Sequence, residues 1–544
     1  MDKRWLNLYD QDVPHSLEYP NITLPDILNR TAARTPDYPA LTLNEIVITY
    51  SQLKIRVDAL ANALISFGVN KGDRIALLLP NSPTYVIAYY AIVKIGAVVV
   101  NLNVISQGED LLRLLNHSDP KMVVTLDLFL KNVLEVAEQT SLDRILIHSV
   151  FGLEKESTLP GERIRLEIVN DLISGHSGQE GEQRCEPDDL AVLQYTSGVT
   201  GHPKAVMLTH RSIIDNLVQI DSWNPKPPTQ SRSAICIIPF FHVFGMTVCM
   251  HLSIFRSYQM VLFPRFDWSS IIEILNSIKQ YRPISFPAVP ALWAALVSSS
   301  ETDKYDLSSI EIASGGGSSL SEWIQEKYLR LTGKYISQAY GLSEASSTVF
   351  ITPFRRPGIS SSVGIPLPDT DVKIVDIETG EQELPVGETG EIIFKGPQMM
   401  KGYWQDEEKT SQTIRDGWLY TGDLGYMDDL GYFYLVDRKD DLMISSGYNV
   451  YPSEVERALI KHPQIKDVTV VGISDQLRGD AITAFIIPES DSFPKRQELI
   501  SFCSNYLPDY KIPRFFKFRN ELPKNKIGKP LRRLLKQELL TSRD

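Results

Sequence analysis

The chain is poor in cysteine, with four cysteines among its 544 residues. None belongs to a Cys-x-x-Cys pair or has a histidine at the spacing of a zinc site, which argues against a disulfide scaffold and a zinc centre. The first residues, Met1 to Trp5, also lack the apolar core of a signal peptide. These absences favour a cytoplasmic protein whose cysteines are reduced and structural. They are Cys185, Cys236, Cys249 and Cys503.

The chain also has few uncharged segments that are long enough to cross a bilayer. One of them, residues 234–255, contains no Asp, Glu, Lys or Arg and is long enough to cross a membrane. It also holds Pro239, Gly245 and two histidines, and it is rich in β-branched and aromatic residues. We therefore predict a buried strand, a turn and a helix here, with a membrane-spanning segment as the weaker alternative.

Positive charge is in deficit, because 55 Lys and Arg stand against 67 Asp and Glu, a net charge of −12. An acidic surface repels a phosphate backbone, so we expect no nucleic-acid partner. A local exception is the basic run near the C-terminus, formed by Lys524, Lys526, Lys529, Arg532, Arg533 and Lys536. A nucleic-acid or membrane-surface patch is the alternative for that run. We also predict a peripheral contact with the inner face of a membrane.

The first half of the chain alternates apolar strands with amphipathic helices. Leu53, Val57, Leu60, Leu64 and Phe67 fall at steps of four and three and predict one helical face, with Gly68 as the C-terminal stop. Apolar runs predict buried parallel strands over Ile75–Leu79, Lys121–Leu126 and Arg144–His148. This alternation predicts helices layered on parallel sheets, that is, an α/β fold.

Turn signals become dense after residue 362, and short strands such as Glu391–Phe394 lie between them. This pattern predicts a small antiparallel β unit. The charged run Asp437–Asp441 then has the composition of a linker. The elements predicted beyond it are a helix over Ser453–His462 and strands over Val468–Gly472 and Ala481–Ile487. They predict a second, small α+β domain of roughly 100 residues.

The segment Tyr195–Lys204 is the first candidate for a phosphate-binding site. It reads Tyr-Thr-Ser-Gly-Val-Thr-Gly-His-Pro-Lys and follows the apolar run Leu190–Leu193. Glycines let backbone N–H groups turn toward an anion, hydroxyls donate to phosphate oxygens, and the lysine adds positive charge. The segment does not fit the P-loop pattern, because its lysine follows a proline and precedes an alanine. A polar surface turn is the alternative.

Seven segments in the same order resemble the adenylate-forming superfamily, which contains acyl-CoA synthetases, luciferases and non-ribosomal adenylation domains. They are Tyr195–Lys204, Pro239–His242, Ser314–Gly317, Tyr340–Glu344, Tyr420–Asp423, Asp437–Asp441 and Pro523–Lys529. The resemblance covers nearly the whole chain. The N-terminal residues 5–14 and the stretch 314–340 look most like bacterial long-chain fatty acyl-CoA synthetases.

The resemblance implies ATP and coenzyme A as co-substrates and Mg²⁺ as the cofactor. The residues that it assigns to the ATP phosphates are Thr196, Ser197, Gly198, Thr200, Gly201 and Lys204. Those assigned to adenine and ribose are Gly316, Tyr340, Gly341, Asp423 and Arg438. The implied catalytic residues are Lys529, Glu344 and Thr196, and Glu344 and Thr196 are also the implied metal ligands.

The same resemblance implies how the chain is divided. The expected parts are an N-terminal adenylation domain over residues 1–437, a hinge over 438–440 with Asp440 as its pivot, and a mobile C-terminal domain over 441–544. The residues expected on the coenzyme A path are Ser446 and Gly447, and those expected in the acyl pocket are His242 and Gly315.

The implied reaction activates a fatty acid of medium to long chain as an acyl-adenylate and then transfers the acyl group to coenzyme A. The alternatives are a ligase for an aromatic or other acid, transfer to a carrier protein, and a non-enzymatic scaffold. Four positions depart from the family pattern, and we expect modest effects on rate from them. They are Val199, Ala205, Ser343 and Pro530. We also predict a homodimer.

Overall fold

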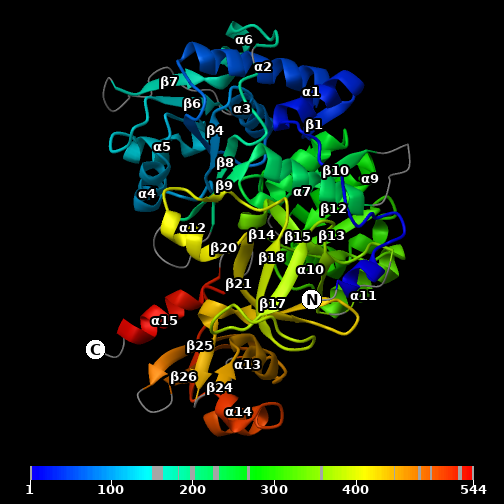
Figure 1. Ribbon diagram of the computed structural model, residues 1–544, viewed down its shortest axis with the longest axis vertical. Coiled ribbons are helices and arrows are strands. Elements are labelled where there is room, and N and C mark those ends of the chain that lie inside the picture. The colour runs from blue at the N-terminus through cyan, green and yellow to red at the C-terminus, as the bar shows by residue number, and fades with distance from the viewer. Residues whose placement is uncertain are drawn as a thin grey trace. The chain divides into compact units, whose positions relative to one another are not determined.

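The computed structural model describes residues 3–149, 163–181, 183–196, 203–224, 232–265, 270–355, 359, 361–445, 448–475, 479–490, 493–524 and 530–541. Contacts group the chain into two compact units (Figure 1). The larger unit comprises Leu6–Asp371 and Lys395–Gly417, and the smaller one comprises Met1–Trp5, Val372–Phe394 and Trp418–Asp544. The hinge at residues 438–440 stays a prediction, because grouping by contacts does not test where a chain bends.

The first sheet of the larger unit has a parallel body and an antiparallel edge. Its order is β19 (Gly402–Tyr403), β9 (Ala205–Thr209), β8 (Leu190–Tyr195), β4 (Val98–Asn101), β3 (Arg74–Leu78), β5 (Met122–Leu126), β6 (Arg144–His148) and β7 (Arg165–Ile168). Strands β8 to β7 run parallel, whereas β9 and β19 run antiparallel to their neighbours. The three buried strands predicted from apolar runs are thereby confirmed as β3, β5 and β6.

Four helices contact strands of this sheet, namely α3 (Pro83–Lys94), α5 (Asp127–Ala137), α6 (Val169–Gly175) and α7 (His210–Trp223). Three more pack against these helices, namely α1 (Leu24–Arg34), α2 (Tyr50–Ser66) and α4 (Gly108–Ser118). The predicted face of α2 is buried at Leu53, Val57, Leu60 and Leu64, whereas Phe67 lies just past the helix end and is half-buried. Gly68 follows the helix with a φ of +77°, the left-handed conformation that commonly ends a helix.

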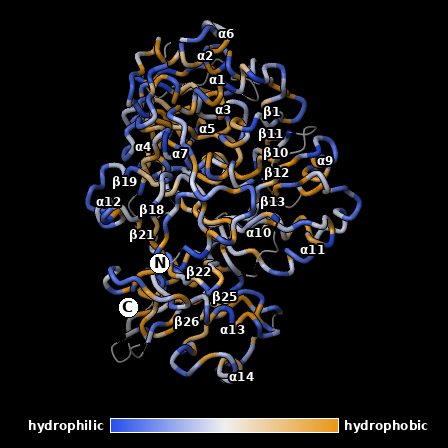
Figure 2. Tube along the Cα trace, turned by 45° about the vertical axis from the view of Figure 1, so that its right-hand side comes forward, coloured by the Kyte–Doolittle hydropathy of each residue, from blue (hydrophilic) through white to orange (hydrophobic). Residues whose placement is uncertain are grey.

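A second sheet completes the larger unit. Its order is β16 (Ser362–Pro366), β15 (Ser347–Ile351), β14 (Ser337–Leu342), β13 (Ile312–Gly316), β12 (Ser285–Ala288), β10 (Ser233–Cys236), β11 (Gln259–Leu262), β1 (Pro39–Leu43) and β2 (Ile46–Thr49). Its core contains Phe286 and Trp293 and is shared with α9 (Ile271–Tyr281), α10 (Pro290–Ser298) and α11 (Glu322–Thr332). Figure 2 shows hydrophobic residues concentrated along the inner strands. Helix α3 contacts strands of both sheets and is buried over Thr84–Lys94, which places it between them.

The uncharged stretch at residues 234–255 is a strand, a turn and a helix, as predicted. It consists of β10, a turn, the π-helix η2 (Gly245–His251) and α8 (Leu252–Phe255). A side chain at Gly245 would collide with the carbonyl oxygen of Pro239, so the turn needs glycine here. No helix within the described residues is long and apolar enough to cross a membrane.

The smaller unit contains the predicted antiparallel strands. They are β17 (Asp371–Val375), β18 (Gly390–Lys395), β21 (Trp418–Met427) and β22 (Phe433–Arg438), in that order. Strand β18 includes the strand predicted over Glu391–Phe394, and it pairs antiparallel with β21. Between β18 and β21, the chain forms β19, α12 (Glu407–Thr413) and β20 (Ile414–Arg415).

A five-stranded sheet with helices on both faces forms the rest of the smaller unit. The strands are β24 (Tyr448–Val450), β23 (Met443–Ser445), β26 (Gly479–Pro488), β25 (Ile465–Asp475) and β27 (Phe515–Phe518). One hydrophobic cluster joins the sheet to α13 (Pro452–Leu459) and α14 (Arg496–Cys503), and another joins it to α15 (Arg532–Thr541). The predicted helix and two strands correspond to α13, β25 and β26, which confirms a small α+β fold.

Candidate functional site

The phosphate-loop candidate connects two antiparallel strands of the larger unit. Strand β8 ends at Tyr195, β9 begins at Ala205, and these two residues are paired. The N–H of Thr196 donates to the carbonyl oxygen of Lys204 at 3.1 Å, which closes the base of the loop. The connection is a hairpin and is followed by a strand, whereas a P-loop leads into a helix. The sequence argument against a P-loop is confirmed.

Of the six residues predicted to contact phosphate, Thr196 and Lys204 lie at the two ends of this loop. Ser197, Gly198, Thr200 and Gly201 lie outside the described residues. Tyr195 anchors the strand before the loop. Its hydroxyl donates to the carbonyl oxygen of Leu114 at 3.1 Å and lies 2.8 Å from Nδ1 of His117.

Burial raises the pKa of Tyr195 above its usual value, so this anchor stays a neutral phenol. A neutral hydroxyl with two polar partners gives the strand a fixed end. The loop base is therefore held on its β8 side by side-chain contacts and on its β9 side by the ladder.

Tyr340, Gly341 and Glu344 lie at the end of β14 and in the short 3-10 helix η5 (Ser343–Ala345). The Tyr340 ring stacks on Phe350, with ring centroids 5.4 Å apart. A side chain at Gly341 would collide with the Ser347 carbonyl oxygen, so the backbone passes too closely for any other residue. Gly341 thus sets the path of the chain from the tyrosine to the glutamate.

Glu344 is held at both its backbone and its side chain. Its carbonyl oxygen accepts a hydrogen bond from the N–H of Met400 at 2.8 Å. Its Oε1 accepts one from the hydroxyl of Tyr403 at 2.7 Å. Sequence reasoning did not find Tyr403, because it lies 59 residues away in the chain and in no segment singled out for chemistry.

His242 and Gly315, predicted for the acyl pocket, lie around β13 and the turn before η2, together with Gly316, which was predicted to contact adenine or ribose. Burial lowers the pKa of His242, so the ring is neutral. Its Nδ1 accepts from the N–H of Phe244 at 3.2 Å, which puts the ring proton on Nε2. A Cβ at Gly316 would lie 3.5 Å from the Phe244 ring, whereas one at Gly315 would lie 3.4 Å from Ile336. Successive strand residues face opposite ways, so Gly316 faces the Phe244 side.

A small apolar cavity lies beside Phe244. It is about 20 Å³ in volume and is bounded by η2, α7 and strands β12 to β15. Its apolar lining residues are Ile220, Phe244, Val248, Leu252, Ile312, Ala339, Ile351 and Phe354. Ser314, next to Gly315, also lines it. At this volume the cavity has room for about one water-sized group, and neither His242 nor Gly315 lines it.

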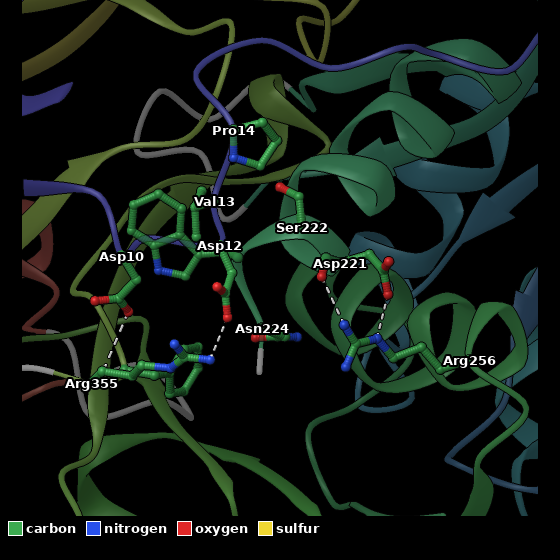
Figure 3. Close-up of a pocket in the computed structure, with 11 residues that line it drawn as sticks. Asp10, Asp12, Val13, Pro14, Asp221, Ser222, Asn224, Arg256 and Arg355 are labelled. Carbon is green, nitrogen blue, oxygen red and sulfur yellow. Dashed lines mark hydrogen bonds and ion pairs between the residues drawn. The ribbon is translucent and has the colours of Figure 1, made fainter. Parts of the chain in front are cut away.

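A larger cavity of about 180 Å³ shares Asn224 and Phe354 with the apolar one. It is lined by charged side chains that are paired with one another (Figure 3). Arg355 contacts Asp12 at 2.6 Å, and Arg256 pairs with Asp221. Asn224 and Phe354 therefore form the partition between the apolar cavity and the one lined by paired charges.

In the smaller unit, the two residues predicted to contact ribose face each other. Asp423 on β21 is paired with Arg438 on β22, and Nε of Arg438 donates to Oδ1 of Asp423 at 2.8 Å. Gly422 has a φ of +69°, and its N–H donates to Oε1 of Glu391 at 3.0 Å. These contacts fix the Thr-Gly-Asp turn that presents the Asp423 carboxylate.

The predicted pivot Asp440 lies in the 3-10 helix η6 (Lys439–Asp441), directly after Arg438. Arg532 at the start of α15 pairs with Glu456 at 2.8 Å and with Asp441 at 3.4 Å. This charge cluster was missed as well, although Arg532 had been noted as part of the basic run. Ser446, Gly447 and Lys529 lie outside the described residues.

The α/β fold, the hairpin loop and the side chains at its strand ends define a nucleotide-binding enzyme of the adenylate-forming class. The family model of the AMP-binding enzyme matches residues 28–404, and that of the AMP-binding enzyme C-terminal domain matches residues 454–529. The chain belongs to the AMP-binding enzyme family.

Similar proteins match over nearly the full length. A long-chain-fatty-acid–CoA ligase of Bacillus subtilis (strain 168) is 38% identical, over 98% of this chain and 98% of that protein. One from Escherichia coli O6:H1 is 33% identical, over 99% and 98%. Among solved structures, ATP-bound MatB from Rhodopseudomonas palustris matches with a TM-score of 0.84 at 26% identity, covering 95% of this chain and 99% of that one.

Proposed function

We propose that the protein is an ATP-dependent fatty-acid–CoA ligase that works through an acyl-adenylate. The observation that carries the proposal is the full-length similarity to long-chain-fatty-acid–CoA ligases, at 38% and 33% identity. The geometry of the larger unit agrees with it, because one strand, β19, connects the end of the phosphate-loop hairpin with Glu344.

In the first half-reaction, a carboxylate oxygen of the fatty acid attacks the α-phosphorus of ATP. The bond to the bridging oxygen breaks, and pyrophosphate leaves with its electron pair. Lys204 at the loop end supplies positive charge for the phosphates, and the loop's N–H groups and hydroxyls supply donors. Lys529 is the catalytic residue that the resemblance assigns to this half.

The residues present fit Mg²⁺. Mg²⁺ is commonly held by one or two carboxylates together with substrate phosphates rather than by a cage of protein ligands. Within the described residues there is no group of three or more His, Cys, Asp or Glu side chains that could form such a cage. Glu344 and the Thr196 hydroxyl would hold the ion, which when bound offsets charge on the phosphates.

In the second half-reaction, the thiol of coenzyme A attacks the acyl carbonyl and AMP leaves. Asp423, held by Arg438, keeps the ribose hydroxyls of the AMP part in place through its carboxylate. The C-terminal domain, residues 441–544, turns about Asp440 between the two halves and brings Ser446 and Gly447 to the thiol. This division of labour lets one site carry out two reactions in sequence.

The full-length similarity to long-chain-fatty-acid–CoA ligases supports an acid with a hydrocarbon chain. The neutral ring of His242 adds no charge to the predicted acyl pocket, and most residues that line the small cavity beside Phe244 are apolar. Medium to long fatty acids are the proposed substrates. Peripheral contact with a membrane, a homodimer and a cytoplasmic location complete the proposal, and vesicle flotation and light scattering test the first two.

Pyrophosphate release tests the function directly. The purified protein is given ATP, Mg²⁺ and acids from hexanoate to octadecanoate, with cinnamate and benzoate as aromatic controls, with and without coenzyme A. We expect release with fatty acids and acyl-CoA as the product. Release with the aromatic acids alone would replace the fatty-acid assignment, and absence of release with every acid would refute the enzyme assignment.

A further inference from the structure

We infer that Tyr403 is a positioning residue for the first half-reaction, which orients the Glu344 carboxylate and ties it to the phosphate loop. The inference rests on the proposed function, since it takes Glu344 as the ligand of the ATP-bound cation. Tyr403 and Glu344 lie 59 residues apart in the sequence, so their hydrogen bond is seen only in the folded structure.

The contact itself is a short, direct hydrogen bond. The Tyr403 hydroxyl donates to Oε1 of Glu344 at 2.7 Å, within the range of a bond from a hydroxyl to a carboxylate. The bond uses Oε1, so Oε2 remains as an oxygen ligand for a cation. Tyr403 is 6% exposed, so its ring has little freedom to follow the carboxylate if that side chain turns. The glutamate rotamer is therefore set by a buried donor.

The same strand that carries Tyr403 pairs with the end of the phosphate loop. Tyr403 is paired with Val206 on β9, and the N–H of Trp404 donates to the carbonyl oxygen of Ala205 at 2.9 Å. Ala205 directly follows Lys204, whose carbonyl oxygen closes the loop base with Thr196. A continuous path of main-chain bonds thus joins the loop ends to the donor of Glu344.

A neighbouring helix locks the strand from its other side. The hydroxyl of Thr410 in α12 accepts from the N–H of Tyr403 at 2.9 Å and donates to the carbonyl oxygen of Asp406 at 2.7 Å. A Cβ at Gly402 would lie 2.7 Å from Cγ2 of Thr410, so the strand and α12 meet with no room for a side chain. Figure 2 places β19 and α12 side by side.

Tyr403 differs from tyrosines with a structural role in the group that accepts the hydrogen bond of its hydroxyl. The buried hydroxyl of Tyr50 donates to backbone carbonyl oxygens, those of Tyr258 at 2.7 Å and Ser253 at 3.2 Å. Such bonds satisfy a buried hydroxyl without serving any ligand. Tyr403 instead donates to a partly exposed carboxylate in the site. Its bond therefore affects how that carboxylate meets a cation.

The test compares Tyr403→Phe with Tyr50→Phe, each of which removes one buried hydroxyl. Isothermal titration measures the dissociation constant of ATP with Mg²⁺ and with EDTA. We expect Tyr403→Phe to weaken binding of Mg·ATP by about tenfold, as the loss of a hydrogen bond to a charged group predicts. Metal-free ATP should bind as it does to the parent protein, and Tyr50→Phe should leave both constants unchanged.

A double-mutant cycle with Glu344→Gln supplies the second measurement. If Tyr403 acts through Glu344, Tyr403→Phe adds little further loss in the Glu344→Gln background. Full additivity, or Mg·ATP binding by Tyr403→Phe equal to that of Tyr50→Phe, would overturn the inference. Failure of the parent protein to bind Mg·ATP would instead refute the proposed function, so the two outcomes are distinguishable.

Discussion

In the larger unit, Thr196 and Glu344 are held by neutral and main-chain hydrogen bonds, whereas Asp423 and Arg532 in the smaller unit are held in ion pairs. Thr196 is held by a backbone bond at the loop base, and Glu344 by a phenol and a backbone N–H. Asp423 is held by an arginine, and Arg532 is held by carboxylates. Main-chain bonds persist as long as the sheet does, whereas side-chain ion pairs can be exchanged when a segment turns. The loop base and Glu344 in the larger unit are thus held by contacts of fixed geometry, and the ion pairs of the smaller unit can exchange where they span Asp440.

Several ion pairs and hydrogen bonds of the smaller unit surround the predicted pivot, Asp440. Asp437 and Asp441 flank Asp440, and Arg532 contacts both, at 4.0 Å and 3.4 Å. The N–H of Ser453 also donates to Oδ2 of Asp437 at 2.8 Å. Contacts that span the pivot must break or change if the chain bends there. A variant of Arg532 therefore tests how much the ion pairs of the smaller unit contribute to its stability.

The largest expected effect is that of Lys529→Ala. Removing a cation that offsets transition-state charge is expected to slow adenylation by about 100- to 1000-fold. The reaction of preformed acyl-adenylate with coenzyme A should persist, because the resemblance places Lys529 only in the first half-reaction. Single-turnover assays of each half measure this. Lys536→Ala, in the same basic run, is the control, and equal loss of both halves by Lys529→Ala would contradict the alternation of the C-terminal domain, residues 441–544.

Arg532→Ala is expected to have the next largest effect, on stability. The Arg532 and Glu456 side chains are 11% and 17% exposed, so the variant leaves a carboxylate buried without its partner. Breaking such a pair costs about 3–5 kcal/mol. Calorimetry should show a large drop in the unfolding transition of the smaller unit. Arg519→Ala breaks the more exposed pair with Glu538 and should cost under about 1 kcal/mol of stability. Equal losses of stability in the two variants would show that burial does not strengthen the Arg532 pair.

The larger unit should lose stability as the pH falls, because it contains the buried histidine His210. Burial lowers the pKa of His210 to about 4, although Asp189 and Asp26 act in the opposite direction. The native state therefore binds this proton less readily than the unfolded state. Its contribution to stability is complete above the unfolded pKa near 6.5 and is lost as the pH falls toward 4.

His210→Gln tests that linkage, since glutamine can still accept the hydrogen bond that the N–H of Leu24 donates to Nδ1. Between pH 7.5 and pH 5, the parent protein should lose about 2 kcal/mol of stability through this histidine. The variant should lose about that much less over the same interval. Denaturant unfolding at the two pH values measures the difference, and identical pH dependence would show that His210 does not carry it.

Phe354→Ala should have the smallest effect, which is a change in kcat/KM for longer acids only. It removes the ring from the partition and enlarges the apolar cavity, so acids long enough to reach the new space gain burial that shorter acids do not. Each further methylene buried is worth about fourfold in kcat/KM. Phe67, at the end of α2, lines neither cavity, and Phe67→Ala is the control. A uniform change across all chain lengths would mean that the partition does not bound the acyl group.

The sequence predicted elements well where burial is continuous. The runs that became β3, β5 and β6 are apolar because both faces of a parallel sheet are covered, and α2 was marked by its apolar face. The phosphate loop was predicted to leave a strand because it follows the apolar run Leu190–Leu193, which lies in β8. Contacts between distant residues were out of reach, because no local pattern records them.

Tyr403 and Arg532 show this limit in physical terms. Tyr403 meets Glu344 across 59 residues, and Arg532 meets Glu456 across 76. A tyrosine after glycine and an arginine in a basic run carry no local sign of a carboxylate partner. Only the pairing of β19 with β9 and the docking of α15 bring these groups together.

The most direct test of the central claim uses a fatty acid with oxygen-18 in both carboxylate positions. If a carboxylate oxygen attacks the α-phosphorus and the thiol then displaces AMP, mass spectrometry will find one oxygen-18 atom in AMP and one in the acyl-CoA. Appearance of the label in inorganic phosphate, with ADP as the nucleotide product, would show activation through an acyl phosphate. That result would contradict the adenylate mechanism.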